Sequence, residues 1–467
     1  MIHRRSPLRA VVASGLVVAA AAAAVATTLS GGAVGVAAGA AGVAGASAES
    51  RNGDGPHAHL PLLELERRDL AARIAAAGPG ETVHFEVSDW VAAMKNYHVE
   101  LSPHELAVLS RGGTSEEVAA GLEEVRLAGN ASVRAVAPPL TSGLCTTDYR
   151  TRKEAGDMWP GERWAWTQAM LKIHQLKGAN NRSIFEQLVE LHSTNAAEAH
   201  GSVQFLPWHY FFLIIVETAL RAVDQYLTLP YWAWSRDALA PYNAPVWEDW
   251  FLGKTVSGQC IQTGPFVNFT TNVPVNHCVL RGFTSGPAPG GSMDFALEDE
   301  ATVNALVADA DLTFPEWSDT WEIAHGGPHL AVGGATVRGD MYRVSRSPND
   351  PVFYLHHAYV EKVWRDRQAA QGASYSGTHR GTPVSVNDRL APFDLPVWRA
   401  VWDRCVWYQP TTRSFPGGAP AASGRVSRST RVRQSALLKE FFRSNGLADN
   451  VEKVDAAQEV LAKATEA

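Results

Sequence analysis

Apolar side chains recur at three- and four-residue intervals in several stretches of the chain, which is the spacing of one helical face. Five stretches predict helices: 162–176, 183–191, 205–227, 315–330 and 351–368. The last follows Asn349-Asp350, a capping pair, and starts with a proline suited to the first helical turn. Residues 82–87 alternate between apolar and polar positions and predict a short strand. Loops rich in glycine and proline fill the rest, so the pattern predicts a mainly α protein.

The first 48 residues have a different pattern and predict an export signal peptide. A basic head precedes an Ala/Val-rich run over residues 10–29, and a small-residue exit follows at 46–48. Arg4-Arg5 resembles a twin-arginine signal. The alternative is an uncleaved membrane anchor, because the run approaches the roughly 20 residues that span a bilayer. Cleavage is favoured because alanine and glycine are weakly apolar. The mature protein is then secreted, with no membrane contact.

Tryptophan marks the main domain, since fourteen of the fifteen tryptophans lie between Trp159 and Trp407. We therefore expect an N-terminal extension of unknown role over 49–144 and the main domain over 145–410. A linker and a helical C-terminal tail follow over 411–467, because a Pro/Gly/Ala/Ser-rich stretch precedes a helix-like pattern.

Composition excludes several classes of protein. Only 19% of the residues are charged and 46% are hydrophobic, which argues against a disordered chain. The net charge of −7 argues against a nucleic-acid binder, which normally has a basic face. Four cysteines are too few for a disulfide scaffold, although they suffice for two bridges. The remaining class is a globular, mostly ordered protein.

Seven of the sixteen histidines fall into two groups on or next to the predicted helices. The first group is His192, His200 and His209; the second is His325 and His329, with His356-His357 about thirty residues later. Two histidines at i and i+4 project their rings from one helical face, as a shared metal ion requires. A single pair would more often be ordinary surface or core histidines. Two groups in an apolar domain, with no cysteine or carboxylate at ligand spacing, favour a metal.

The ligand type suits zinc, copper, iron or nickel. A zinc hydrolase would place a general-base acid beside its ligands, as in H-E-x-x-H, but Gly326 occupies that position. Two all-histidine sites within one helical domain fit a pair of copper ions that bind O2 between them.

At this point the chain resembles the type-3 copper family of tyrosinases, catechol oxidases and hemocyanins. His200 followed by Phe205-Leu206-Pro207-Trp208-His209 is similar to the family's first copper signature, and residues 350–357 (DPVFYLHH) are similar to its second. The resemblance covers about 145–408. It implies an antiparallel helix bundle that holds two copper ions in loop-rich surroundings, with phenols and O2 as substrates and, in some bacterial members, a copper-delivering helper protein.

The resemblance also implies roles for individual residues. His192, His200 and His209 would bind one copper, and His325, His329 and His357 the other. His356 would lie behind the ligands or simply be packed, with neither favoured. Glu217 and Asp350 would orient ligands, although a helix cap is an equally good interpretation of Asp350.

The position after His325 bears on the activity. Phenol-hydroxylating members of the family often carry asparagine there, and it is thought to polarise a water that deprotonates a monophenol. Gly326 has no side chain, so we expect oxidation of o-diphenols or o-aminophenols to o-quinones, with weak or absent monophenol hydroxylation. The alternatives are a true tyrosinase and a hemocyanin-like O2 carrier. Residues 49–144 either cover the site until cleavage or are an independent addition, and the second is slightly favoured.

The cysteines suit an oxidising compartment. Cys260 and Cys278 lie in one loop-rich segment and could form a disulfide bond, and Cys145 and Cys405 could form another. The sequence alone leaves all three pairings of the four cysteines open.

Overall fold

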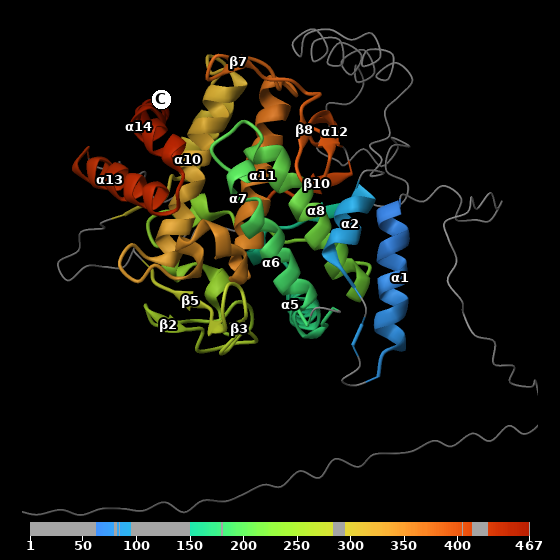
Figure 1. Cartoon of the computed structure of the whole chain (residues 1–467). Helices are drawn as coiled ribbons and strands as arrows, with labels where there is room; N and C mark the ends of the chain where they lie inside the picture. Colours follow the sequence, from blue (N-terminus) through green and yellow to red (C-terminus); the bar gives the residue numbers. More distant parts are fainter. Residues whose placement is uncertain are drawn as a thin grey trace, which may run out of the picture. The chain divides into compact units, whose positions relative to one another are not determined.

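The structure is a computed structural model that describes residues 62–78, 82–83, 85–94, 150–178, 181–283, 295–403, 405–412 and 428–466. The predicted export signal over 1–48, most of the extension over 49–144 and the linker stretch 413–427 lie outside these residues. The described part is helix-rich, which confirms the predicted mainly α fold (Figure 1).

Each of the five predicted helices forms, with small shifts at the ends. They are α5 (Pro160–Gln175), α6 (Ile184–Thr194), α8 (Phe205–Val223), α10 (Phe314–Gly333) and α11 (Val352–Gln371). Helix α6 begins with a capping box, in which the Glu186 amide donates to the Ser183 hydroxyl and the Ser183 amide donates to the Glu186 carboxylate. Helix α8 ends four residues before the predicted end, because Asp224 is extended and closes the last turn.

The other helices surround this bundle. Their bounds are α1 (Leu62–Ala76), α2 (Val87–Ala93), α7 (Ala196–Ala199), α9 (Glu300–Ala308), α12 (Trp398–Trp402), α13 (Arg428–Ser444) and α14 (Ala448–Glu466). Helix α1 packs against α8, and α2 packs against α6. The C-terminal helices α13 and α14 form a hairpin against α10 (red beside yellow in Figure 1).

Strands are short and occur in pairs. Parallel β1 (Arg150–Arg152) and β10 (Val406–Tyr408) join the two ends of the main domain. The antiparallel pairs are β2 (Gln259–Cys260) with β5 (Leu280–Arg281), β3 (Thr270–Thr271) with β4 (His277–Cys278), β6 (Thr378–His379) with β7 (Thr382–Pro383), and β8 (Arg389–Leu390) with β9 (Leu395–Pro396). The Cys260–Cys278 disulfide ties β2 to β4. Cys145 lies outside the described residues, so its pairing with Cys405 stays a prediction.

The strand predicted over 82–87 is wrong, since the described residues of this stretch form no strand and α2 begins at Val87. A side chain, and not a neighbouring strand, makes the hydrogen bonds of this backbone. The Val87 amide donates to the Gln187 side-chain oxygen at 2.7 Å, and the Gln187 nitrogen donates to the Phe85 carbonyl at 3.2 Å. The Gln187 amide therefore takes the place of a neighbouring strand.

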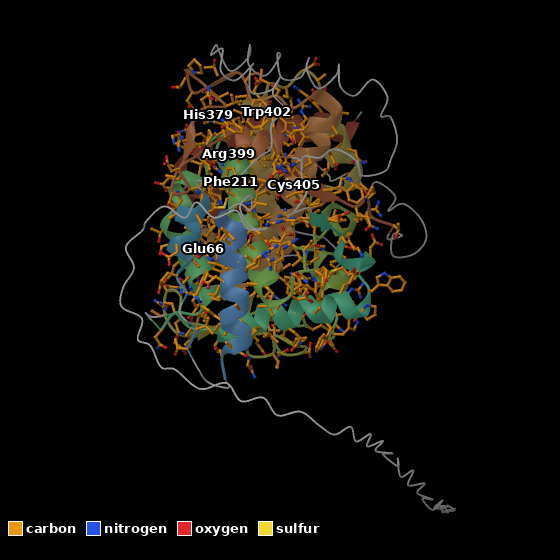
Figure 2. All side chains as sticks on the ribbon, turned by 90° about the vertical axis from the view of Figure 1, so that its right-hand side faces the viewer. Glu66, Phe211, His379, Arg399, Trp402 and Cys405 are labelled. Atoms are coloured by element: carbon orange, nitrogen blue, oxygen red, sulfur yellow. A yellow bond between two sulfur atoms is a disulfide. The ribbon has the colours of Figure 1, made fainter. Side chains whose placement is uncertain are left out.

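Helix α8 lies at the centre of the core. Among the described helices, it alone is long and apolar enough to cross a membrane, but 89% of the relevant window is buried within the protein. Figure 2 shows α1 in front of the bundle, and the Arg67 guanidinium of α1 donates to the Arg221 carbonyl of α8 at 2.9 Å. These contacts identify α8 as a helix of the protein core.

A buried ion network joins α8 to the β1–β10 pair and to α11. The Glu217 carboxylate accepts from Arg150 and Arg152, and Arg152 also donates to Glu361 and to the Tyr408 hydroxyl. Burial raises the Glu217 pKa, but Arg152 and Arg150 outweigh it and lower the pKa to about 2. The network therefore holds an ionised carboxylate inside the bundle.

Candidate metal centre

Three histidines meet between α6 and α8. His192 lies on α6, His200 directly follows α7, and His209 lies on the first half of α8. All three are buried, and their available ligand nitrogens lie within 4.8 Å of one another. The ring centroids are 4.9–5.5 Å apart. These are the three residues that the sequence predicts for one copper.

Four histidines form the second group. His325 and His329 lie one helical turn apart on α10, and His356 and His357 are adjacent on α11. Their ligand nitrogens also lie within 4.8 Å of one another, and all four are buried. The group thus contains the predicted trio together with His356, which the sequence placed behind the ligands or in the packing.

Backbone carbonyls orient most of these rings. The Nδ1–H groups of His200, His209, His325 and His329 donate to the carbonyls of Ala196, Phe205, Glu322 and Met341, respectively, at 2.8–2.9 Å. The Nε2 atoms of His200, His325 and His329 are buried and have no partner among the described residues. This pattern fixes the tautomer and leaves a bare nitrogen lone pair, as in metal-ligating histidines.

The geometry of the first trio fits a bound cation. The Nε2 atoms of His192 and His209 are 3.4 Å apart. Two imidazole nitrogens that each lie about 2 Å from one tetrahedral ion would be separated by about 3.3 Å. Burial lowers the pKa of every histidine in both groups, that of His200 to about 4 and that of His329 to about 3. The rings are therefore neutral near pH 7 and free to bind metal without releasing protons.

The two groups adjoin. The His209 and His357 rings are stacked at 4.1 Å with an interplanar angle of 10°, and the His200 and His325 rings are stacked at 6.0 Å. Two ions held by the two groups would therefore be close neighbours. Phe205 and Phe353 lie against rings of both groups, so the surroundings are apolar and aromatic.

Glu217 and Asp350, predicted to orient ligands, bind other partners. The Glu217 oxygens accept from Arg150, Arg152 and the Leu229 amide. Asp350 accepts hydrogen bonds from Nε and Nη2 of Arg281 at 2.7 and 2.8 Å and from the Val352 amide at 3.2 Å. Asp350 therefore caps the start of α11, which carries His356 and His357, and influences the site through that helix.

Sequence reasoning missed a network that supports His329. The carbonyl that orients His329 belongs to Met341, and the preceding Asp340 is fully buried. Asp340 accepts from the Leu280 amide, His277 and Asn349 at 2.8–3.2 Å. The hydrogen bond to Asp340 raises the His277 pKa. No spacing marks Asp340 in the sequence, because its partners come from remote segments.

We expect Asp340→Ala to weaken metal retention, because the Met341 carbonyl loses its anchor and the His329 ring loses its orientation. Outer-shell changes at metal sites reduce affinity or activity by about 10- to 100-fold. Dialysis against a graded chelator, followed by metal analysis, measures the effect. Asp69→Ala, which removes a half-exposed carboxylate from α1, is the control. Full metal retention by folded Asp340→Ala protein would contradict the supporting role.

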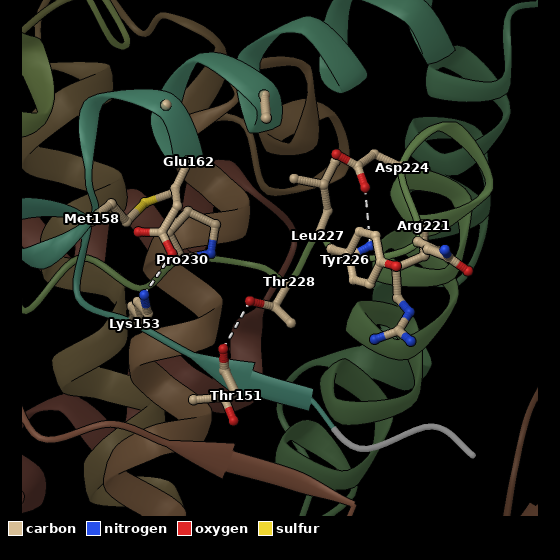
Figure 3. A pocket seen from close by; sticks show the side chains of 13 residues that line it. Thr151, Lys153, Met158, Glu162, Arg221, Asp224, Tyr226, Leu227, Thr228 and Pro230 are labelled. Atoms are coloured by element: carbon tan, nitrogen blue, oxygen red, sulfur yellow. Dashed lines mark hydrogen bonds and ion pairs between the residues drawn. The ribbon is translucent and has the colours of Figure 1, made fainter.

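Apart from the histidine groups, the described residues line a cavity of about 540 Å³ at the C-terminal end of α8 (Figure 3). Lys153, Glu162, Asp224 and Tyr226 contribute to its lining, and Lys153 is paired with Glu162 at 2.5 Å. It contains none of the seven histidines, so it offers no metal ligands of this type.

Comparisons with known proteins agree with this geometry. The family model described as the common central domain of tyrosinase matches residues 182–370, which contain all seven histidines. The tyrosinase of Streptomyces glaucescens is 34% identical over 268 residues, which are 52% of this chain and 92% of that protein. The chain belongs to the tyrosinase family. The family resemblance seen in the sequence is therefore confirmed.

Two further comparisons find lower sequence identities. Grixazone synthase of Streptomyces griseus is 29% identical over 250 residues, which are 42% of this chain and 79% of that protein. A polyphenol oxidase structure from Thermothelomyces thermophila has 21% identity and a TM-score of 0.44, and covers 67% of this chain and 99% of its own. As a tyrosinase-family copper oxidoreductase, the chain binds two copper ions, and its two histidine groups fit a dicopper site.

Proposed function

We propose that this tyrosinase-family protein oxidises o-diphenols or o-aminophenols to o-quinones with O2 and hydroxylates monophenols weakly or not at all. The observation that carries the proposal is the convergence of two buried histidine groups with bare ring nitrogens. His192, His200 and His209 would hold one copper, and His325, His329 and His357 the other.

The choice of His357 over its neighbour rests on ring positions. His357 stacks on His209 and so lies between the two groups. His356 stacks instead on His325 at 5.3 Å and lies 6.3 Å from Trp234. The contact with a ring of the first group supports His357 as the ligand, whereas the described ring contacts of His356 are with His325 and His329 on α10, with Trp234 and with His357.

The copper pair would supply the exchange of electrons between the phenol and O2. The chain supplies the rest. Helices α6, α8, α10 and α11 and the residue after α7 carry the imidazoles, and backbone carbonyls orient the rings of His200, His209, His325 and His329. Phe205 and Phe353 exclude water from the space between the groups and offer flat apolar surfaces to an aromatic ring.

The preference for diphenols rests on Gly326, which follows His325 on α10. A monophenol must lose its hydroxyl proton in the site, and glycine cannot help to polarise a water that removes it. Proton removal with the help of a positioned group raises the reaction rate by about 10²–10⁴-fold. We therefore expect the copper-loaded protein to oxidise catechols far faster than tyrosine or other monophenols.

Quinone formation from L-dopa and from L-tyrosine, followed by absorbance and by O2 uptake, tests this preference. A zinc-loaded sample is the control, since zinc has no redox chemistry. Comparable rates with both substrates would identify a true tyrosinase. Reversible O2 uptake without quinone formation would identify a carrier. Either result would contradict the proposal.

We also propose that the protein is exported through the predicted signal over 1–48 and acts outside the cytoplasm. The Cys260–Cys278 disulfide supports an oxidising compartment. We propose a copper-delivering helper protein as its partner, which co-purification from the native host would detect.

A further inference from the structure

Exposed aromatic side chains gather around helix α5. Trp159 and Trp164 lie at the start of α5, and Tyr226 follows the C-terminal end of α8. The Arg163 guanidinium of α5 lies over the Trp250 ring, 4.0 Å from its centroid. In the part of the chain that the structure describes, these four are the aromatic side chains most exposed to solvent. Exposed rings that collect in one place mark a binding surface, because contact with water is unfavourable for them.

The surface between these rings is hollowed. The cavity of Figure 3 and a second cavity, of about 390 Å³, share Ala165 and Asp224 in their linings and therefore adjoin. Together they follow α5 from Gly161 to Gln175, a length of about 21 Å at 1.5 Å per residue. A Cβ atom added to Gly161 would meet no other atom within 4 Å. The two cavities form one elongated groove, the α5 groove, whose shape fits a chain-like ligand.

An aromatic ring stands in each part of the α5 groove. Tyr226 lines the first cavity and is 84% exposed, whereas Trp164 lines the second and is 65% exposed. The face of an aromatic ring is electron-rich, so it attracts the partly positive C–H groups on the flat face of a sugar ring. Two such rings in one groove offer two stacking positions along a chain of sugars.

The polar groups of the α5 groove suit hydroxyl groups. Three exposed side-chain amides, those of Gln168, Gln175 and Gln225, offer both donors and acceptors. The Asp224 carboxylate accepts from the Tyr226 amide at 3.0 Å and retains further lone pairs (Figure 3). A sugar hydroxyl both donates and accepts hydrogen bonds, so a lining that contains both kinds of group complements it.

The charges of the lining nearly balance. Lys153 pairs with Glu162 at 2.5 Å, and Arg221 and Asp224 contribute one charge of each sign. Lys172 adds one further positive charge, while the whole chain has a net charge of −7 and repels polyanions. A protein partner would bury a continuous apolar centre, whereas here amides and charged groups separate the rings. The lining therefore favours a neutral, hydroxyl-rich chain.

We propose that the α5 groove binds a neutral oligosaccharide chain, with sugar rings against Trp164 and Tyr226 and hydroxyl groups at the glutamine amides. The lining contains none of the seven histidines and none of the residues whose carbonyls orient them. The groove would thus attach the protein to a polysaccharide without occupying the histidine groups. This binding site goes beyond the proposed oxidase function and does not depend on it.

Calorimetric titration of the copper-loaded, full-length protein with neutral hexasaccharides tests the site. The probes are cellohexaose, chitohexaose, xylohexaose and laminarihexaose. We expect at least one of them to bind, and the disaccharide of the same sugar to bind more weakly, because it is too short to reach both rings. Polygalacturonate and polylysine serve as charged comparisons.

Substitutions locate the bound sugar. Trp164→Ala and Tyr226→Ala should each weaken hexasaccharide binding by about 10-fold or more, the loss typical of an aromatic anchor. Ala165→Trp fills the junction of the two cavities and should abolish binding. Val432→Ala, at a position of α13 that is 64% exposed, is the matched control and should leave binding unchanged. Circular dichroism verifies folding, and copper content should stay that of the natural protein in all four variants.

The outcomes are independent of the oxidase activity. Failure of all four hexasaccharides to bind would overturn the proposal. Binding that Trp164→Ala and Tyr226→Ala leave unchanged would also overturn it, since the sugar would then lie elsewhere. Preferential binding of polygalacturonate or polylysine would identify a charge-driven surface and contradict a neutral ligand. Binding that both aromatic variants weaken and Val432→Ala does not weaken supports the site, even in protein that forms no quinone.

Discussion

Substitution of His209 by alanine is expected to abolish catechol oxidation and to lower the copper content from two ions per chain to one. The His209 ring is buried, is oriented by the Phe205 carbonyl and has its Nε2 atom 3.4 Å from that of His192. Alanine leaves the first ion with two ligands in an apolar cavity. The loss of activity should exceed the roughly 10- to 100-fold loss that changes outside the ligand set produce.

The adjacent histidines of α11 provide a matched comparison. His357→Ala should remove the second copper, whereas His356→Ala should retain both ions. The two variants are matched, because each loses one buried imidazole from the same helical turn. Copper analysis after gel filtration measures the stoichiometry, and circular dichroism verifies folding. Retention of two ions by His357→Ala, with loss of one by His356→Ala, would exchange the roles of these residues.

Substitution of Glu217 by alanine is expected to destabilise the fold by about 3–5 kcal/mol, the cost of leaving a buried charge partner uncompensated. Two buried guanidinium groups, those of Arg150 and Arg152, would lose their shared carboxylate. Chemical denaturation measures the free energy of unfolding. Asp69→Ala is the control, because it breaks a half-exposed pair within one helix, worth about 0.3–0.5 kcal/mol.

The effect of Glu217 should depend on pH. Its folded pKa of about 2 lies below the ordinary value of 4.5. The stabilisation is therefore complete above about pH 4.5 and is lost as the pH falls towards 2. The difference in stability between the natural protein and Glu217→Ala should narrow over that range. A difference that stays constant, or a loss of copper from folded Glu217→Ala protein, would argue against a purely structural network.

Local patterns in the sequence predicted the helices that carry the centre. The apolar pattern predicted helices α6, α8, α10 and α11, and the capping pair Asn349-Asp350 predicted the start of α11. The two histidine groups were also predictable, because helical spacing places His325 and His329 on one face. The wrong strand at 82–87 shows the limit of such patterns, since a single remote side chain, Gln187, satisfies its backbone.

The sequence by itself determined the helical class, the two histidine groups and, through two long motifs, the tyrosinase family. Only the tertiary structure decided that Glu217 belongs to an arginine network, that Asp340 supports His329 and that the C-terminal hairpin lies on Gly326. The physical reason is the distance along the chain between the residues that interact. Helices, caps and i,i+4 pairs depend on residues within one or two turns, whereas these three features depend on contacts between segments tens to hundreds of residues apart, which leave no periodic signal in the chain.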